Sequence, residues 1–191
     1  MIKAILLAAG QSKRLKSENK LIKLYKKKPL INYSLKALYK SKVNKVIIVL
    51  GNQYKEVKKI IKKNKKNIFI NNKSYKKGMA SSIKIGLKKV GKKDKGFIIV
   101  QSDMPFMKPS DINKIYSSIK SQKFLVHALR NKKRVGNPIG FDISIVKKFK
   151  RIKGDVGAKF MVKRLKNETN FIETSNLKSF KDFDKASDFR T

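Results

Sequence analysis

Short apolar runs alternate with amphipathic stretches along this chain. Apolar runs of this length predict buried β-strands, here at Ile2–Ala8, Val46–Leu50, Ile68–Ile70, Phe97–Val100 and Phe124–Ala128. The stretches between them predict helices at Ile31–Tyr39, Gln53–Lys63, Met79–Lys89 and Pro109–Ile119. Nearly unbroken apolar strands that alternate with helices are typical of a mainly parallel sheet covered on both faces. The pattern therefore predicts an α/β, Rossmann-like fold with a mostly parallel central sheet and helices on both faces.

The length of 191 residues fits one well-buried core and is short for two. The chain has no Pro/Ser-rich linker and no clear repeat, so we expect residues 1–191 to form a single domain. In such sheets ligands bind beyond the carboxyl ends of the strands, near a switch in strand order. The loops after Leu7, Leu50 and Val100 are therefore predicted to form one functional rim.

Positive charge dominates the surface chemistry. The chain carries 50 Lys and Arg against 12 Asp and Glu, a formal net charge of +38, which first suggests a polyanionic partner such as a nucleic acid. However, Lys, Ile and Asn are abundant together and all have A/T-rich codons, and the lysines are spread along the chain rather than gathered in one arm. We attribute the excess mainly to composition and expect no specific nucleic-acid partner; a basic nucleic-acid-binding protein stays as the non-enzyme alternative.

Cysteine is absent, which excludes disulfides, thiolate zinc sites and cysteine nucleophiles. Met1 leads directly into the first predicted strand, so no signal peptide is expected. No apolar run approaches the roughly 18 residues of a membrane span. These features predict a cytoplasmic protein that makes no use of a membrane.

The first predicted strand ends in a loop suited to phosphates. In "LLAAGQSKRLKSENKLIKL", residues 6–24, small residues follow the strand, and Arg14 and Lys20 come after them. Small residues let backbone N–H groups approach a ligand closely, and cations nearby would neutralise it. The stretch matches neither the P-loop nor the dinucleotide-binding glycine pattern. A tight strand-to-helix turn with surface cations remains the alternative.

Two further stretches lie near predicted strand ends. In "VQSDMPFM", residues 100–107, Asp103 directly follows a buried strand, where a carboxylate facing a phosphate loop would hold a divalent metal; a turn or capping aspartate is the alternative. In "KKGMASSIKIGL", residues 76–87, Gly78 precedes a helix whose first turn carries Ser81 and Ser82. Free N–H groups and hydroxyls there could bind a base or ribose, and a glycine turn with serine caps is the simpler alternative.

Five stretches in order carry a family resemblance. "LAAGQSKR…NKL", "GMASSIKIGL", "SDMPF", "GNPIGF" and "GDVGAKF" together resemble the molybdenum cofactor cytidylyltransferases, within the broader class of Rossmann-like nucleotide-transferring enzymes. The stretch "DFDKASDF", residues 182–189, resembles a degraded form of that class's closing D-x-D-T-P-x-D signature. The resemblance spans nearly the whole chain. It implies transfer of CMP from CTP to the phosphate of molybdopterin, with release of pyrophosphate.

The resemblance also implies roles for individual residues. The nucleotide loop falls on Leu7, Ala8, Ala9 and Gly10. The proposed catalytic set falls on Arg14 and Lys20, as triphosphate-binding cations, and on Asp103, as a Mg²⁺ ligand. Mg²⁺ is thus the expected cofactor, CTP and a molybdopterin-type phosphorylated acceptor are the expected partners, and a recipient molybdoenzyme is a further candidate partner.

The remaining roles concern the base and the acceptor. Gly78 and Ser82 fall where the pyrimidine base is held, whereas Asn137 and Asp155 fall on the acceptor side, Asp155 also as a second metal ligand. Lys16 replaces a family glycine that tightens the phosphate loop; if that position needs a positive φ, the lysine costs about 1 kcal/mol or more.

Several alternatives stay open. The same chemistry could use GTP as donor, or a sugar phosphate or methylerythritol phosphate as acceptor. An accessory protein that binds and delivers molybdopterin cytosine dinucleotide is another. The sole histidine, His127, lies inside an apolar run and is expected to be a packed strand residue rather than a catalyst.

Overall fold

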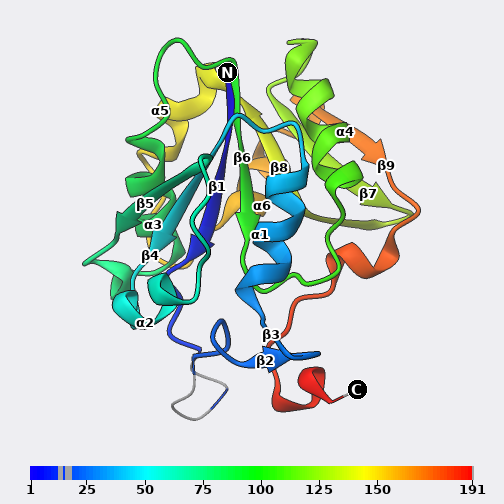
Figure 1. Ribbon diagram of the computed structural model, residues 1–191. Helices are drawn as coiled ribbons and strands as arrows, with labels where there is room; N and C mark the ends of the chain where they lie inside the picture. The colour runs from blue at the N-terminus through cyan, green and yellow to red at the C-terminus, as the bar shows by residue number, and fades with distance from the viewer. Residues whose placement is uncertain (13–14, 16–18, 191) are drawn as a thin grey trace.

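A seven-stranded sheet forms the centre of the computed structural model, which describes residues 1–12, 15 and 19–190. The strand order is β5-β4-β1-β6-β8-β7-β9 (Figure 1). The strands are β1 (Ile2–Ala8), β4 (Lys45–Leu50), β5 (Asn67–Asn71), β6 (Gly96–Gln101), β7 (Val126–Asn131), β8 (Arg134–Asp142) and β9 (Thr169–Glu173). A separate two-stranded sheet joins β2 (Leu24–Tyr25) to β3 (Lys28–Pro29).

The sheet is mostly parallel, as predicted. β1 pairs in parallel with both β4 and β6, β4 with β5, and β7 with β9, whereas β8 runs antiparallel to β6 and β7. The chain leaves β1 for β4 on one side and later returns to β6 on the other. The switch in strand order therefore lies at the carboxyl ends of β1 and β6, where a ligand crevice is expected in such sheets.

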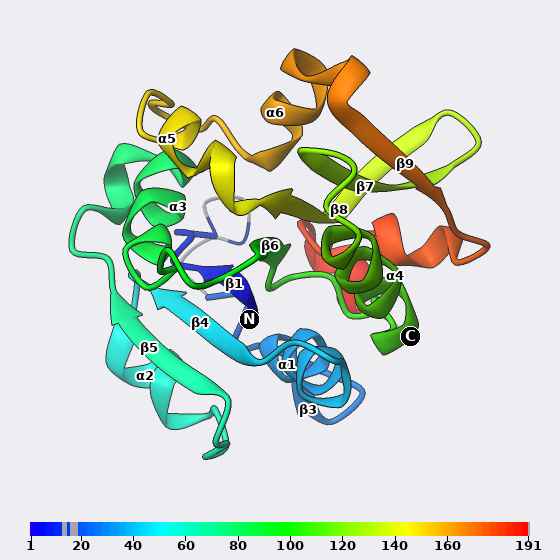
Figure 2. The same cartoon turned by 90° about the horizontal axis from the view of Figure 1, so that it is seen from above.

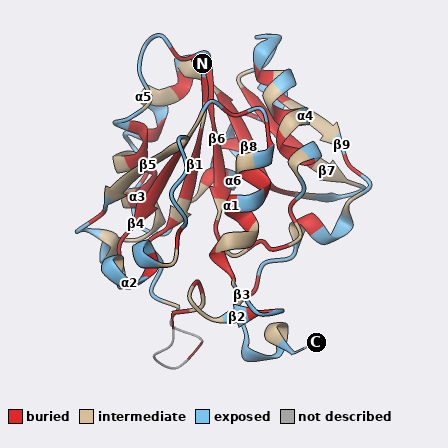
Figure 3. Ribbon diagram, in the orientation of Figure 1, coloured by how far each residue is buried: buried red, intermediate tan, exposed pale blue. Residues whose placement is uncertain are grey.

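Helices cover both faces of the sheet (Figure 2). One face packs against α1 (Ile31–Lys40), α2 (Tyr54–Lys59) and α4 (Pro109–Lys120), and the other against α3 (Met79–Leu87), α5 (Val146–Phe149) and α6 (Ala158–Arg164). The central strands β1, β4 and β6 are almost wholly buried between these layers (Figure 3). Burial on both faces explains why the central strands are continuous apolar runs rather than alternating ones. No helix among the described residues is long and apolar enough to span a bilayer.

Every predicted strand and helix is present, but several bounds differ. The helix expected at Gln53–Lys63 is shortened to Tyr54–Lys59; the chain turns at Ile60, Ile61 still packs in the core, and the lysine-rich segment after it is exposed. The strand expected at Phe124–Ala128 begins at Val126 and continues to Asn131.

Four strands were not predicted, namely β8 and β9 of the main sheet and the short β2 and β3 of the hairpin. In β8 glycines interrupt the apolar run, yet they are required by packing: a Cβ on Gly140 would lie 2.4 Å from Cγ2 of Ile115 in α4. Because Gly140 has no side chain, α4 can approach the strand closely. β9 is a half-buried strand at the sheet edge, and its polar positions hide the apolar signal that marks the central strands.

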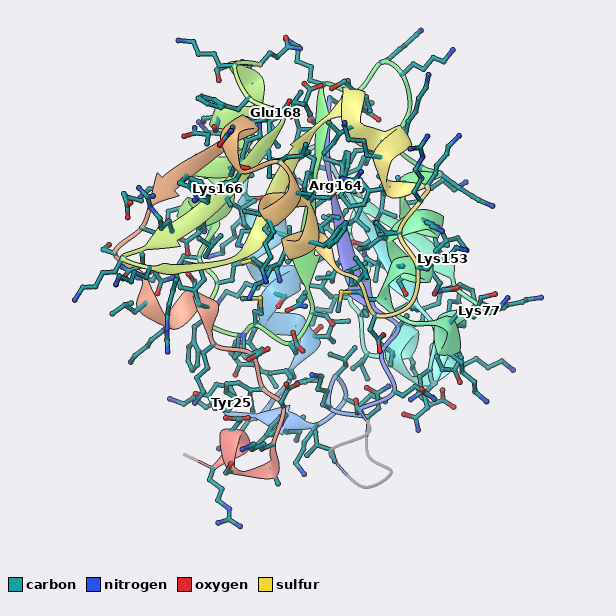
Figure 4. The ribbon with its side chains drawn as sticks, turned by 180° about the vertical axis from the view of Figure 1, so that it is seen from behind. Tyr25, Lys77, Lys153, Arg164, Lys166 and Glu168 are labelled. Atoms are coloured by element: carbon teal, nitrogen blue, oxygen red, sulfur yellow. The ribbon has the colours of Figure 1, made fainter. Side chains whose placement is uncertain are left out.

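The C-terminal segment returns to the β2–β3 hairpin through an aromatic cluster, which we define as Tyr25, Tyr33, Phe106, Phe183 and Phe189. The ring of Phe183 lies 4.9 Å from that of Tyr25 and 5.7 Å from that of Phe106, centroid to centroid. Figure 4 labels Tyr25 beside this segment, at the end of the molecule where the C-terminus lies. The cluster holds the two aspartates that flank Phe183 near the carboxyl end of β6, since the Phe183 N–H donates to the Asp103 carbonyl at 3.0 Å.

His127 lies in β7 and is fully buried, with Nδ1 2.7 Å from Ser118 Oγ on α4. Burial lowers the pKa of His127 from 6.5 to about 4, against the opposing charge of Asp142. The predicted role as a packed strand residue agrees with this placement.

The His127 pKa predicts a pH-dependent stability. Because the folded-state pKa lies below the unfolded value, the neutral ring contributes stability above about pH 6.5, and this is lost as the pH falls through about 4. We expect the free energy of unfolding to drop across this window by up to about 3 kcal/mol relative to a His127→Gln variant. Urea unfolding of both proteins at several pH values measures this, and parallel pH profiles would contradict the assignment.

Candidate active site

A cavity of about 450 Å³ lies at the carboxyl ends of β1 and β6. Eight of the residues singled out in the sequence line it: Leu7, Ala9, Gly10, Lys20, Gly78, Ser82, Asp103 and Asp155. They come from loops far apart in the chain, which the parallel strands bring to one edge of the sheet. The loop after β4 supports this edge, since the Asn52 N–H approaches the Ala9 carbonyl at 3.4 Å.

Lys20 lies between two carboxylates. Its Nζ is 2.6 Å from Asp103 Oδ2 and 2.7 Å from Asp184 Oδ1, and the Lys20 side chain is 16% exposed. Burial alone would lower the pKa of Lys20, but the charges and hydrogen bonds of Asp103 and Asp184 outweigh it and raise that pKa above its usual value. Lys20 is therefore a fixed positive charge in the cavity at any neutral pH.

Asp103 has one oxygen engaged and one free. Oδ2 contacts Lys20, whereas Oδ1 is buried and has no hydrogen-bond partner among the described residues. Burial raises the pKa of Asp103 above its ordinary value, and the Lys20 ammonium opposes that rise. A buried carboxylate oxygen without a donor at the wall of a cavity fits a hard divalent cation, for which oxygen ligands are preferred.

The cavity is acidic in spite of the basic chain. Four aspartates line it, namely Asp103, Asp155, Asp182 and Asp184, against two lysines among the described lining residues, Lys20 and Lys76. The whole sequence holds only 12 acidic residues, so a third of them meet here. The described residues form no group of three or more His, Cys, Asp or Glu side chains close enough to hold a metal by themselves. The arrangement suits a cation that shares its ligands with a phosphorylated substrate.

Gly78 and Asp155 meet at the beginning of α3. Gly78 has φ +92°, and a Cβ there would lie 2.4 Å from the carbonyl carbon of Gly154, so only glycine fits without movement. The Met79 N–H then donates to Asp155 Oδ1 at 3.2 Å, and the Ala80 N–H to the Gly154 carbonyl at 3.0 Å. The loop before α3 and the loop before α6 thus form one wall of the cavity.

Two predicted site residues do not line the cavity, and a third falls outside the described residues. Ala8 is buried at the end of β1 and lies behind the described lining rather than in it. Asn137 is buried in β8, and the described cavity lining does not include it. Arg14 lies outside the described residues, as does Lys16 with its expected cost in the loop.

Two of the four aspartates that line the cavity, Asp182 and Asp184, were not predicted as site residues. The signal was present, because both belong to the closing stretch "DFDKASDF". Their sequence neighbours gave no reason to place them near Lys20, which is 164 positions from Asp184. The aromatic cluster, rather than any local pattern, brings them there.

Comparison with known proteins identifies a relative in sequence and several solved structures with the same fold. A curated relative, 2-C-methyl-D-erythritol 4-phosphate cytidylyltransferase of Lachnoclostridium phytofermentans, is 34% identical over 141 residues; the alignment covers 70% of this chain and 58% of that protein. The chain thus spans less than two thirds of the length of that relative.

Solved structures share the fold. Rv0371c of Mycobacterium tuberculosis superposes with a TM-score of 0.84 at 20% identity, covering 98% of this chain and 95% of that one. Its manganese complex gives a TM-score of 0.75 at 18% identity, covering 91% and 88%. A nucleotidyl transferase from Methanothermobacter thermautotrophicus gives a TM-score of 0.84 at 18% identity, covering 99% and 94%.

A family model described as the MobA-like NTP transferase domain matches residues 4–169, which include most of β1, all of β4, β5, β6, β7 and β8, and the first residue of β9. That range holds the loop after β1, Asp103, Gly78 and Asp155, which form most of the cavity wall. The match takes in well over half of the 191 residues. The chain therefore belongs to the MobA-like NTP transferase domain family, a family of nucleotidyltransferases.

Proposed function

We propose that this protein transfers CMP from CTP to the phosphate group of a small phosphorylated acceptor, of the methylerythritol phosphate kind, and releases pyrophosphate. The observation that carries the proposal is the position of Lys20 between Asp103 and Asp184 at the wall of the cavity. The 34% identical relative, named as a cytidylyltransferase for such an acceptor, supports both the nucleotide and the acceptor.

The reaction asks for positioning and charge compensation rather than covalent catalysis. An acceptor phosphate oxygen attacks the α-phosphorus of CTP and forms the new P–O bond. The bond between the α-phosphorus and the bridging oxygen breaks, and its electron pair leaves with pyrophosphate. Lys20 would balance the negative charge that gathers on the triphosphate and the leaving group, while the backbone at Ala9 and Gly10 would lie against the phosphates.

A divalent cation is part of this proposal. The free Oδ1 of Asp103 and the carboxylate of Asp184 would hold it, and Mg²⁺ is the ion we expect. The cation would supply Lewis-acid neutralisation of the phosphate oxygens. The manganese complex of a protein with the same fold is consistent with a divalent ion. Asp155 stays a predicted second ligand, and Asn137 a predicted acceptor-side residue.

Molybdopterin is the second candidate acceptor. The MobA-like family match and the five stretches in order favour it, and it is the acceptor that the resemblance to the molybdenum cofactor enzymes implies. The name of the 34% identical relative favours the methylerythritol phosphate alternative instead. We place that alternative first because it rests on a direct sequence alignment.

A donor and acceptor panel tests the proposal. Initial rates of pyrophosphate release are measured with CTP, UTP, GTP and ATP, each with Mg²⁺ and with methylerythritol phosphate, molybdopterin, a hexose 1-phosphate or no acceptor. CTP with methylerythritol phosphate is expected to give the highest rate. A preference for molybdopterin would move the assignment to the second candidate, and a purine nucleotide preference would contradict the CTP assignment.

Replacing Phe183 by alanine is predicted to lower both the free energy of unfolding and the activity. It is 1% exposed at the centre of the aromatic cluster, and truncation of such a core phenylalanine costs about 3 kcal/mol. Phe183→Ala is expected to lower the free energy of unfolding by about that amount and to weaken activity well below wild type, because Asp184 loses its anchor beside Lys20.

Phe149→Ala is the matched control. Phe149 is also fully buried, but it packs on Phe97 and Phe141 away from the cavity. It should cost similar stability with little loss of activity at a temperature where both variants are folded. Urea unfolding and CTP-dependent rates are compared; equal activity losses in the two variants would contradict the anchoring role.

A further inference from the structure

Asn72 follows β5 and is buried, with 2% of its surface exposed. Its Oδ1 accepts the Ser74 N–H at 3.1 Å, and its Nδ2 donates to Ser81 Oγ at 2.9 Å and to Ser82 Oγ at 3.0 Å. A backbone N–H has only a donor to offer, so the bond from Ser74 fixes which end of the amide is oxygen. The amide nitrogen of Asn72 must therefore face the two serines of α3.

The two serine hydroxyls differ in where their protons go. Ser81 Oγ donates to the Gly78 carbonyl at 2.8 Å or to the Ser74 carbonyl at 3.1 Å, and Ser81 is absent from the described lining of the cavity. Ser82 is 5% exposed, lines the cavity, and accepts from Asn72. Among the described residues its proton has no acceptor. Since Asn72 occupies one of the two oxygen lone pairs of Ser82 and no described residue accepts its proton, the O–H of Ser82 is available to donate into the cavity.

We propose that Asn72 is a positioning residue that sets the polarity of Ser82, so that the cavity presents a hydrogen-bond donor to N3 of the pyrimidine and thereby selects cytosine over uracil. This inference rests on the proposed function in taking CTP as the nucleotide. Cytosine has an unprotonated N3 that accepts a hydrogen bond, whereas uracil carries a proton at N3. Ser82 could meet the N3–H of uracil only with its second lone pair, which would leave its own buried proton without an acceptor among the described residues and disfavour the wrong base by roughly tenfold or more.

The inference predicts that selectivity can be weakened by replacing one heavy atom of Asn72, the amide nitrogen, with oxygen. In Asn72→Asp, one carboxylate oxygen still accepts the Ser74 N–H, and the other now accepts from Ser82 instead of donating to it. The Ser82 oxygen then offers only lone pairs to the cavity, which suit the N3–H of uracil. We expect the ratio of the UTP to the CTP dissociation constant, measured by calorimetry with Mg²⁺ and no acceptor, to fall roughly tenfold or more.

The pH dependence separates this role from simple structural damage. A protonated carboxyl at position 72 has one O–H that can donate to Ser82 in place of the amide, so the ratio in Asn72→Asp should approach the wild-type value as the carboxyl is protonated at acidic pH and fall as the pH rises. The wild-type ratio should change far less across the same range. A uniform loss of affinity for both nucleotides at every pH would overturn the inference.

The Ser82→Ala variant tests the same hydrogen bond independently, and it can be used if Asn72→Asp does not fold. It removes the donor itself, so the UTP/CTP ratio should fall toward one, while Ser81→Ala should leave the ratio unchanged. In a Ser82→Ala background, Asn72→Asp should have no further effect on the ratio. A ratio unaltered in Ser82→Ala, or a full Asn72→Asp effect without Ser82, contradicts the inference.

The outcomes are distinct from those of the proposed function. CTP binding with the predicted ratio but no pyrophosphate release with any acceptor would refute the transfer reaction and leave the inference standing. Turnover of CTP with a ratio that does not depend on Asn72 and Ser82 would refute the inference and leave the reaction standing.

Discussion

Replacing Asp103 by asparagine is expected to reduce turnover about 100-fold or more while the fold is retained. Asparagine has nearly the same shape and can still accept from Lys20, which lies 2.6 Å from Oδ2. It removes the negative charge and presents an amide where the free Oδ1 would meet a cation. Steady-state rates and the electron paramagnetic resonance of added Mn²⁺ measure the two consequences, and both activity and metal affinity should fall together.

Asp142→Asn provides the control for the change of charge. Asp142 ends β8 and pairs with Gly96, at the edge of the sheet opposite to the cavity, where its side chain accepts the Ser144 N–H at 2.8 Å. This variant should turn over at close to the wild-type rate. Activity near wild type in Asp103→Asn, or an equal loss in both variants, would contradict the metal assignment.

Lys20→Met is expected to lower kcat/KM for CTP about 100-fold or more. The change removes the cation that would balance the triphosphate, and it leaves Asp103 and Asp184 without their shared partner. Since the Lys20 ammonium opposes the rise that burial causes, its loss should raise the pKa of Asp103 further. The rise in activity with pH should therefore move to higher pH in Lys20→Met, which the pH profile of kcat/KM measures.

Lys3→Met is the matched control for this ion pair. Lys3 lies at the other end of β1, with Nζ 2.8 Å from Asp94 Oδ2 and 13% of its side chain exposed. Removing it should lower the free energy of unfolding and leave kcat/KM for CTP and its pH profile unchanged. A shifted pH profile in Lys3→Met, or none in Lys20→Met, would show that the effect does not arise from the Asp103 contact.

The sequence predicted those parts of the fold that depend on local pattern. Central strands such as β1 and β6 are buried on both faces, so their apolar runs are unambiguous. β8 was missed because Gly140 serves a contact with Ile115 that only the folded chain creates. No single segment of the sequence shows which strands are neighbours in the sheet. The strand order places β1 beside β6, and the loops that follow these two strands therefore lie side by side.

The site was predicted where chemistry and strand ends coincide, as at Gly10, Lys20 and Asp103, all of which line the cavity. Asp184 was missed because its contact with Lys20 depends on Phe183 and the aromatic cluster, a tertiary interaction across most of the chain. Asn72 was missed for a similar reason, since it acts through Ser82 and does not itself line the described cavity.

The high positive charge of the chain does not extend to the described lining of the cavity. Its described lining has four aspartates and two lysines, although the chain as a whole has a formal charge of +38. The cavity therefore does not share the strong positive charge of the chain as a whole. A polyanion bound through the general surface charge should be released by moderate salt, whereas CTP bound in the cavity with a divalent cation should be much less sensitive.

The most direct test of cytidylyl transfer is ³¹P nuclear magnetic resonance of the complete reaction. The protein is incubated with CTP, Mg²⁺ and methylerythritol phosphate, and the resonances of CTP, pyrophosphate and a new diphosphate diester are followed together. We predict that one diester and one pyrophosphate appear for each CTP consumed, and that neither appears with Asp103→Asn. CTP consumption that yields CMP or CDP without a diester, or no reaction with any phosphorylated acceptor, would contradict the assignment.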